Sequence, residues 1–154
     1  MGYKECLEKA GAKVIDFKEF GSYQGTWLAF VEYKGEIGIV EGSYGSCSSC
    51  DAFQSEFNYY SLPTIEDGKY YRNGDTWNEE DECTEGEYKV ALKSYEDRFI
   101  EFGRSYLETD SKPNLYNKQH YELRLSKLDM EDCFDVEESE YIKWAISKLS
   151  ITPQ

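Results

Sequence analysis

The sequence predicts an α+β fold, with a three-stranded antiparallel sheet in the N-terminal half and a helical C-terminal half. Three short runs rich in aromatic and β-branched residues follow one another before residue 42, which is typical of strands. Apolar residues then recur at helical spacing in two later segments, 87–108 and 137–149. Between the halves, Cys47 and Cys50 stand in a Gly- and Ser-rich turn. Their spacing is typical of a structural zinc knuckle.

A short helix is expected at the start of the chain. Residues 3–10 can present Cys6, Leu7 and Ala10 on one inner face. Gly11 then ends the helix, because glycine accepts the left-handed conformation that closes many helices.

The predicted sheet is a meander of three consecutive strands. They are expected at 12–20, 26–33 and 36–41. Lys34 and Gly35 form a tight two-residue reversal between the second and third strands. The third strand therefore delivers the chain directly into the cysteine turn.

The segment after the cysteine turn begins with a short helix and continues as a long connection. Asp51 is well placed to cap a helix that runs to Phe57. Residues 58–86 have no sustained period, and a connection of this length is usually functional or disordered. Should Cys83 bind the same zinc ion, this connection becomes an acidic flap pinned at both ends.

Residues 87–108 form the clearest predicted helix, and Lys112-Pro113 ends the segment. Its inner stripe is expected to consist of Ala91, Tyr95, Phe99, Phe102, Tyr106 and Leu107, widened by Val90 and Leu92.

The remaining part of the chain contains one ambiguous and one clear segment. Residues 115–128 fit both a strand and a helix, and we favour the helix. Asp135 and Glu138 resemble a capping pair for a final helix. The inward side chains of that helix are expected to be Tyr141, Ala145, Ile146 and Leu149.

Length and composition indicate one domain over residues 1–154. The sequence contains no apolar run long enough to span a bilayer, and its first ten residues carry charges where a signal peptide is apolar. We therefore expect a protein of the cytoplasm. Five cysteines, an odd number, favour thiols or metal ligands over disulfides in that compartment.

The formal net charge of −14 is concentrated in two parts of the chain. Residues 58–85 hold eight acids and two bases, and residues 129–154 hold seven acids and two bases. Such a charge repels nucleic acids and anionic membranes and attracts basic protein surfaces. The predicted partner is a basic protein that itself binds nucleic acid; the alternative is that the charge serves solubility alone.

We predict zinc as the cofactor, held first by Cys47 and Cys50. Cys83 is the preferred third ligand and Cys133 the fourth. The alternatives are His120, Cys6 and Asp51, although Asp51 serves equally well as a helix cap. The cysteine pair also fits thioredoxin-type redox chemistry, or two unconnected thiols.

Catalytic signatures are missing from the sequence. It has one histidine, His120, and lacks the HExxH, zinc-deaminase, GxSxG, Walker and dinucleotide motifs. We therefore expect a protein that is not an enzyme.

Two acidic segments are the predicted partner-binding residues. They are Glu79, Glu80, Asp81 and Glu82 in the first segment, and Asp129, Glu131 and Asp132 in the second. Charge runs are usually solvated faces, and acids just before the last helix also oppose its macrodipole favourably.

The motif GSYGSCSSCDAFQSEF at 42–57, preceded by YQGTWLAFVEYKGEIGIVEG at 23–42 and followed by FIEFGRSYL at 99–107, resembles small proteins of phages and mobile elements. Within that group, a small acidic zinc protein is similar to type II-A anti-CRISPR proteins. The resemblance implies an inhibitor that binds a basic lobe of an RNA-guided DNA nuclease and prevents target DNA from loading. The alternatives are a zinc-stabilised phage domain for another host factor, or a redox or hydrolytic enzyme that uses the cysteine pair.

Overall fold

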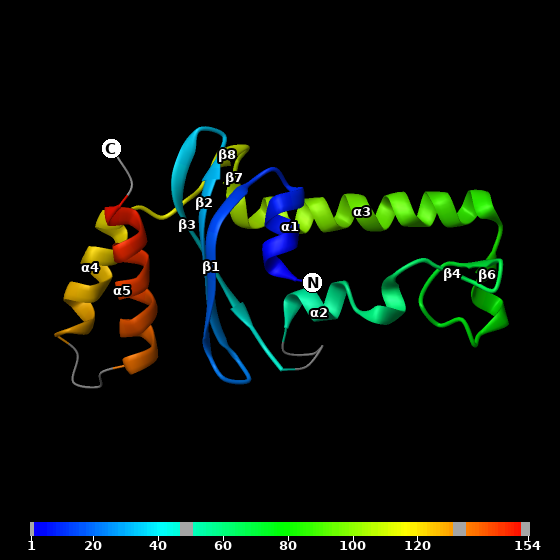
Figure 1. The fold of residues 1–154 in the computed structure, drawn as a ribbon, viewed down its shortest axis with the longest axis horizontal. Helices are drawn as coiled ribbons and strands as arrows, with labels where there is room; N and C mark the ends of the chain where they lie inside the picture. Colours follow the sequence, from blue (N-terminus) through cyan, green and yellow to red (C-terminus); the bar gives the residue numbers. More distant parts are fainter. Residues whose placement is uncertain (1, 47–50, 131–134, 152–154) are drawn as a thin grey trace.

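The computed structural model describes residues 2–46, 51–130 and 135–151, and it confirms the predicted α+β class (Figure 1). The helices are α1 (Tyr3–Lys9), α2 (Ala52–Glu56), α3 (Glu85–Leu107), α4 (Lys118–Leu128) and α5 (Val136–Ser150). The strands are β1 (Lys13–Gly21), β2 (Gly25–Tyr33), β3 (Glu36–Tyr44), β4 (Thr64–Glu66), β5 (Lys69–Tyr71), β6 (Glu82–Cys83), β7 (Glu108–Thr109) and β8 (Lys112–Pro113). No helix in these three ranges is both long and apolar enough to cross a bilayer.

The predicted meander is confirmed. Strands β1, β2 and β3 lie side by side in chain order, and both pairs are antiparallel. Lys34 and Gly35 have φ angles of 49° and 81° and make the two-residue reversal between β2 and β3. Positive φ at both positions matches the twist of the flanking strands, so the turn fixes their register.

Helices cover both faces of this sheet, and the middle strand is therefore buried on both sides. Trp27, Ala29 and Val31 belong to an apolar cluster with α1, α2 and α3. Leu28 and Phe30 belong to a second cluster with α4 and α5. None of these five side chains is more than 4% exposed. The run from Trp27 to Val31 is continuously apolar because neither of its faces meets water.

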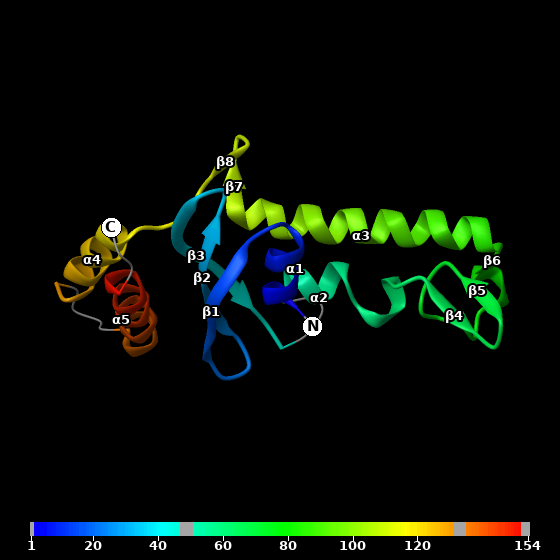
Figure 2. The same ribbon diagram turned by 45° about the horizontal axis from the view of Figure 1, so that its top comes forward.

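Helix α3 extends well beyond the sheet and carries a small sheet at its far end (Figures 1 and 2). Tyr95 and Phe99 pack against Phe57, with ring centroids 5.5 Å apart in both pairs. Strands β4, β5 and β6 form the distal sheet, within the segment expected to be a long irregular connection. That expectation was wrong because strands of two or three residues are too short to show a period. We call residues 58–85 the distal head.

The predicted inner stripe of α3 is confirmed in the C-terminal part of the helix and wrong at one N-terminal position. Tyr95, Phe99 and Leu107 are buried, as expected. Val90, expected to widen the stripe, is 72% exposed. The reason is its position, since this part of α3 lies beyond the main sheet (Figure 1). Its contact with the distal head is made by Tyr88, whose ring centroid lies 5.2 Å from that of Tyr70, and not by Val90.

Both C-terminal helices form as preferred. The ambiguous segment is helical from Lys118, which is α4. Asp135 caps α5, because its side chain accepts a hydrogen bond of 3.0 Å from the backbone N–H of Glu138. Tyr141, Ala145 and Leu149 are buried as predicted.

The closest approach between α1 and α3 occurs at Gly103. A Cβ atom at that position would lie 2.0 Å from the carbonyl oxygen of Cys6 and 3.2 Å from Ala10 Cβ. Glycine is therefore required there by space, and the packing of α1 depends on it.

Gly103→Ala is expected to lower the free energy of unfolding by about 1–3 kcal/mol, because the added methyl group overpacks a buried contact. Gly86→Ala, on the same helix, is the matched control. A Cβ at Gly86 meets nothing closer than 3.9 Å, so helix propensity should raise stability by up to about 1 kcal/mol. Urea denaturation measures the free energy of unfolding of both variants. Equal changes in the two would contradict the close contact at Gly103.

Candidate functional site

Asp51 joins the two described ends of the cysteine turn. Its side chain is buried, with 5% of the residue exposed. The backbone N–H of Gly45 donates to its Oδ2 at 2.9 Å, and the backbone N–H of Gln54 donates to its Oδ1 at 3.1 Å. The hydroxyl of Tyr3 also donates to Oδ1, at 2.8 Å. One carboxylate thus fastens the end of β3 to the start of α2 and to α1.

These bonds keep Asp51 ionised. Burial alone would raise the pKa of Asp51, but hydrogen bonds from Gly45, Gln54 and Tyr3 outweigh it and leave the pKa below its usual value. Its predicted role as the cap of α2 is confirmed. The three hydrogen bonds use most of the roughly four lone-pair sites of the carboxylate, which leaves little capacity for a metal ion.

An open groove of about 680 Å³ lies beside this carboxylate. Tyr3, Tyr23, Tyr44 and Gln54 are among the residues that line it. Burial is the main cause that raises the pKa of Tyr3, so its hydroxyl remains a neutral donor. The groove offers aromatic surface and hydrogen-bonding groups around the base of the cysteine turn.

The structure describes two of the five cysteines, Cys6 and Cys83. Cys6 is fully buried, and its thiol donates to the carbonyl oxygen of Tyr3 at 3.1 Å. Burial raises the pKa of Cys6 to about 12, which suits a core thiol and not a metal ligand. The other predicted ligands, Cys47, Cys50 and Cys133, lie outside the described residues. Within 2–46, 51–130 and 135–151, no three Cys, His, Asp or Glu residues are grouped closely enough to hold a metal ion.

Cys83 does not lie near Asp51, the described residue that follows the cysteine turn. Tyr3, the partner of Asp51, has its ring centroid 6.0 Å from that of Phe102 on α3. Cys83 precedes the first turn of the same helix. At a rise of 1.5 Å per residue, the start of α3 lies roughly 25 Å along the helix axis from Phe102. Sulfurs that share a zinc ion are within about 4 Å of one another. Residues 58–85, expected to form a flap beside the cysteine turn, therefore lie as a head at the far end of α3 from Asp51 and Tyr3.

His120, an alternative ligand, lies on the other face of the sheet. Its ring stacks on Tyr116 with centroids 4.2 Å apart, and it packs at 5.0 Å against the buried Tyr121. Nε2 is buried without a hydrogen-bond partner in the described structure. Burial lowers the pKa of His120, with Arg124 as a second cause, so the ring is neutral and acts as packing.

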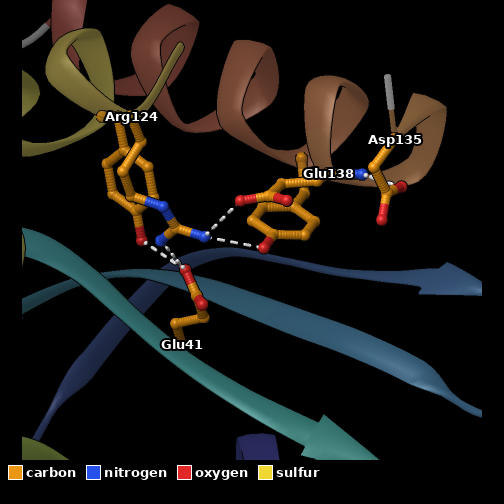
Figure 3. A network of polar contacts seen from close by, with 6 residues as sticks. Glu41, Arg124, Asp135 and Glu138 are labelled. Atoms are coloured by element: carbon orange, nitrogen blue, oxygen red, sulfur yellow. Dashed lines mark hydrogen bonds and ion pairs between the residues drawn. The ribbon is translucent and has the colours of Figure 1, made fainter. Parts of the chain in front are cut away.

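A network around Arg124 was missed by the sequence analysis (Figure 3). Its guanidinium lies 2.8 Å from Glu41 Oε1 and 3.4 Å from Glu138 Oε1. It also donates to the hydroxyl of Tyr141 at 2.7 Å, while Tyr121 donates to Glu41 at 3.1 Å. The network ties α4 and α5 to β3. The available signal was a single arginine between the apolar positions of α4.

The described residues of the two predicted acidic segments lie at opposite ends of the molecule (Figures 1 and 2). Glu79, Glu80, Asp81 and Glu82 are in the distal head, and Asp129 follows α4 on the far side of the main sheet. Glu131 and Asp132 lie outside the described residues. A single partner surface of ordinary size therefore does not contact both groups.

No family model matches this chain, and neither the curated proteins nor the solved structures contain a significant match.

Asp51→Asn is expected to lower the free energy of unfolding at pH 7 by about 1–3 kcal/mol, because a buried acceptor of backbone N–H groups is replaced. The pKa of Asp51 is lowered on folding, so its contribution is complete above about pH 4 and is lost as the pH falls through the folded-state value. The stability gap between wild type and variant should therefore narrow in acid.

Urea denaturation between pH 7 and pH 2.5 measures this gap. Asp97→Asn, at an exposed site on α3, is the matched control and should change stability little. A gap for Asp51→Asn that is independent of pH would contradict the ionised cap.

Proposed function

We propose that this protein is a non-enzymatic inhibitor whose acidic surface binds a basic, nucleic-acid-binding protein. The partner to test first is the one implied by the anti-CRISPR resemblance, an RNA-guided DNA nuclease whose DNA-loading surface is basic. Occupation of that surface by carboxylates would exclude the phosphates of target DNA.

The observation that carries this proposal is the placement of the acidic run Glu79–Glu82. Helix α3 holds it away from the main sheet, in the distal head (Figure 1). None of these four carboxylates makes an ion pair with a described residue. They therefore keep their charge available to a partner, and their projection allows them to enter a concave basic surface.

The second acidic segment has a different setting. Asp129 caps the C-terminal end of α4, beside the helical layer on the other side of the sheet. We therefore assign partner binding to the distal head, and we expect Asp129 to be a solvated charge at the end of α4.

The binding prediction is tested by reversing charge on the head. Glu79→Lys with Glu80→Lys should weaken binding to the purified nuclease by about tenfold or more and restore DNA loading. Glu8→Lys with Glu96→Lys, at exposed sites on α1 and α3, makes the same change in net charge and should stay within about twofold.

Binding of the wild type should also weaken steeply with added salt, because exposed charges are screened. Titration calorimetry at several salt concentrations measures both effects. An equal loss of nuclease affinity in the two double variants would mean that binding depends on net charge alone. An absence of nuclease binding by the wild type would overturn the proposed partner.

We also propose a structural zinc ion at the cysteine turn, held by Cys47, Cys50 and Cys133 and not by Cys83. The described residues next to these segments approach one another at one end of the sheet. Burial raises the pKa of Tyr44, and the carboxylates of Glu19 and Glu137 raise it further. In the sequence, Glu137 follows Cys133 by four residues and Tyr44 precedes Cys47 by three. Gly25, the strand partner of Tyr44, would carry a Cβ atom 3.0 Å from Glu137 Oε1.

Elemental analysis tests this ligand set. Purified wild type and Cys83→Ser should each contain about one equivalent of zinc, while Cys47→Ser with Cys50→Ser, and Cys133→Ser alone, should lose it. Loss of zinc should also lower thermal stability, since metal binding is coupled to folding. Wild-type protein without zinc would overturn the proposed site. Loss of zinc in Cys83→Ser would overturn the proposal that Cys83 is not a ligand.

A further inference from the structure

Trp77 is the most exposed large apolar side chain among the described residues, at 95%. Tryptophan carries the largest apolar surface of any residue and is usually covered. In the distal head, Tyr60 and Ile65 are also exposed, at 66% and 53%. The distal head therefore exposes three large apolar side chains, and Trp77 is the least covered of them.

The loop that carries Trp77 is held in place on both sides. The backbone N–H of Asp75 donates to Asn73 Oδ1 at 2.9 Å, and that of Glu80 donates to Asn78 Oδ1 at 3.1 Å. The backbone N–H of Gly74 donates to the carbonyl oxygen of Tyr60 at 3.1 Å. The indole is thus presented by a preorganised loop, which lowers the entropy that binding must offset.

Carboxylates surround Trp77 in the chain. Asp75 precedes it by two residues, and the run Glu79–Glu82 begins two residues after it. The nearby base is Arg72, and its guanidinium is already engaged by Glu87 at 2.5 Å and by the carbonyl oxygen of Glu82 at 3.3 Å. An indole face within uncompensated negative charge is suited to a cation.

We propose that Trp77 is the anchor of the distal head and stacks on an arginine or lysine side chain of a basic protein segment. The carboxylates of Asp75 and Glu79–Glu82 attract the segment, and the indole desolvates one of its cations. A second copy of this chain is not the occupant, because two molecules of charge −14 repel one another. This inference rests on the proposed function, since it names the contact by which the head binds its basic partner.

The test uses a synthetic arginine-rich peptide as the probe and the full chain as the receptor. Binding is followed by tryptophan fluorescence and by calorimetry at 0.15 M salt. Trp77→Ala should weaken peptide binding about fivefold or more, Trp77→Phe should weaken it less, and the fluorescence response should vanish in both variants.

Tyr23→Ala is the matched control, because Tyr23 is 82% exposed but lies on the β1–β2 hairpin, away from the head. It should bind the peptide within about twofold of wild type. Equal affinities for Trp77→Ala and Tyr23→Ala would overturn the anchor and leave only charge attraction. Circular dichroism confirms that each variant is folded.

The same variants separate this inference from the proposed function. Peptide binding that depends on Trp77, together with no binding to the nuclease, supports the anchor and overturns the nuclease as partner. Nuclease binding that is unchanged in Trp77→Ala overturns the anchor and leaves the inhibitor proposal intact.

Discussion

The burial of β2 on both faces is the constraint on which the rest of the structure depends. Its five central side chains alternate between two apolar clusters, one shared with α1, α2 and α3 and the other with α4 and α5. Each helix layer would lose its apolar support without this strand. The Arg124 network adds a polar link between β3 and the second layer, where Glu41 raises the pKa of the guanidinium against the opposing effect of burial.

Apolar burial decreases along α3 with distance from the main sheet. The part of α3 near the sheet packs through Phe99 and Leu107, whereas its N-terminal part leaves Val90 exposed. The head at its end has few buried apolar side chains, such as Tyr71 at 8% exposure. Local stability follows apolar burial, so the sheet is the rigid platform and the head is the less stable element. Binding surfaces are commonly found on such elements.

The sequence predicted the main elements because their signals are local and strong. The aromatic run at 26–33, the Lys34-Gly35 turn and the caps at Asp51 and Asp135 each act within a few residues. The distal sheet was not predictable, since its strands are too short to carry a period. The position of Cys83 was missed for another reason. The number of residues between Asp51 and Cys83 does not reveal that the chain after α2 runs alongside α3 to the far end of that helix (Figure 1).

Charge is the remaining feature that requires a cause. Residues 58–85 carry eight acids against two bases, and one of those bases, Arg72, bonds to the backbone and to Glu87 outside this run. Like charges close together destabilise a folded element, and a small sheet with little apolar core has little free energy to offset them. Solvation of a charged face does not by itself explain the exposed indole of Trp77. A basic partner would relieve the repulsion and cover Trp77 in the same step, which accounts for both features at once.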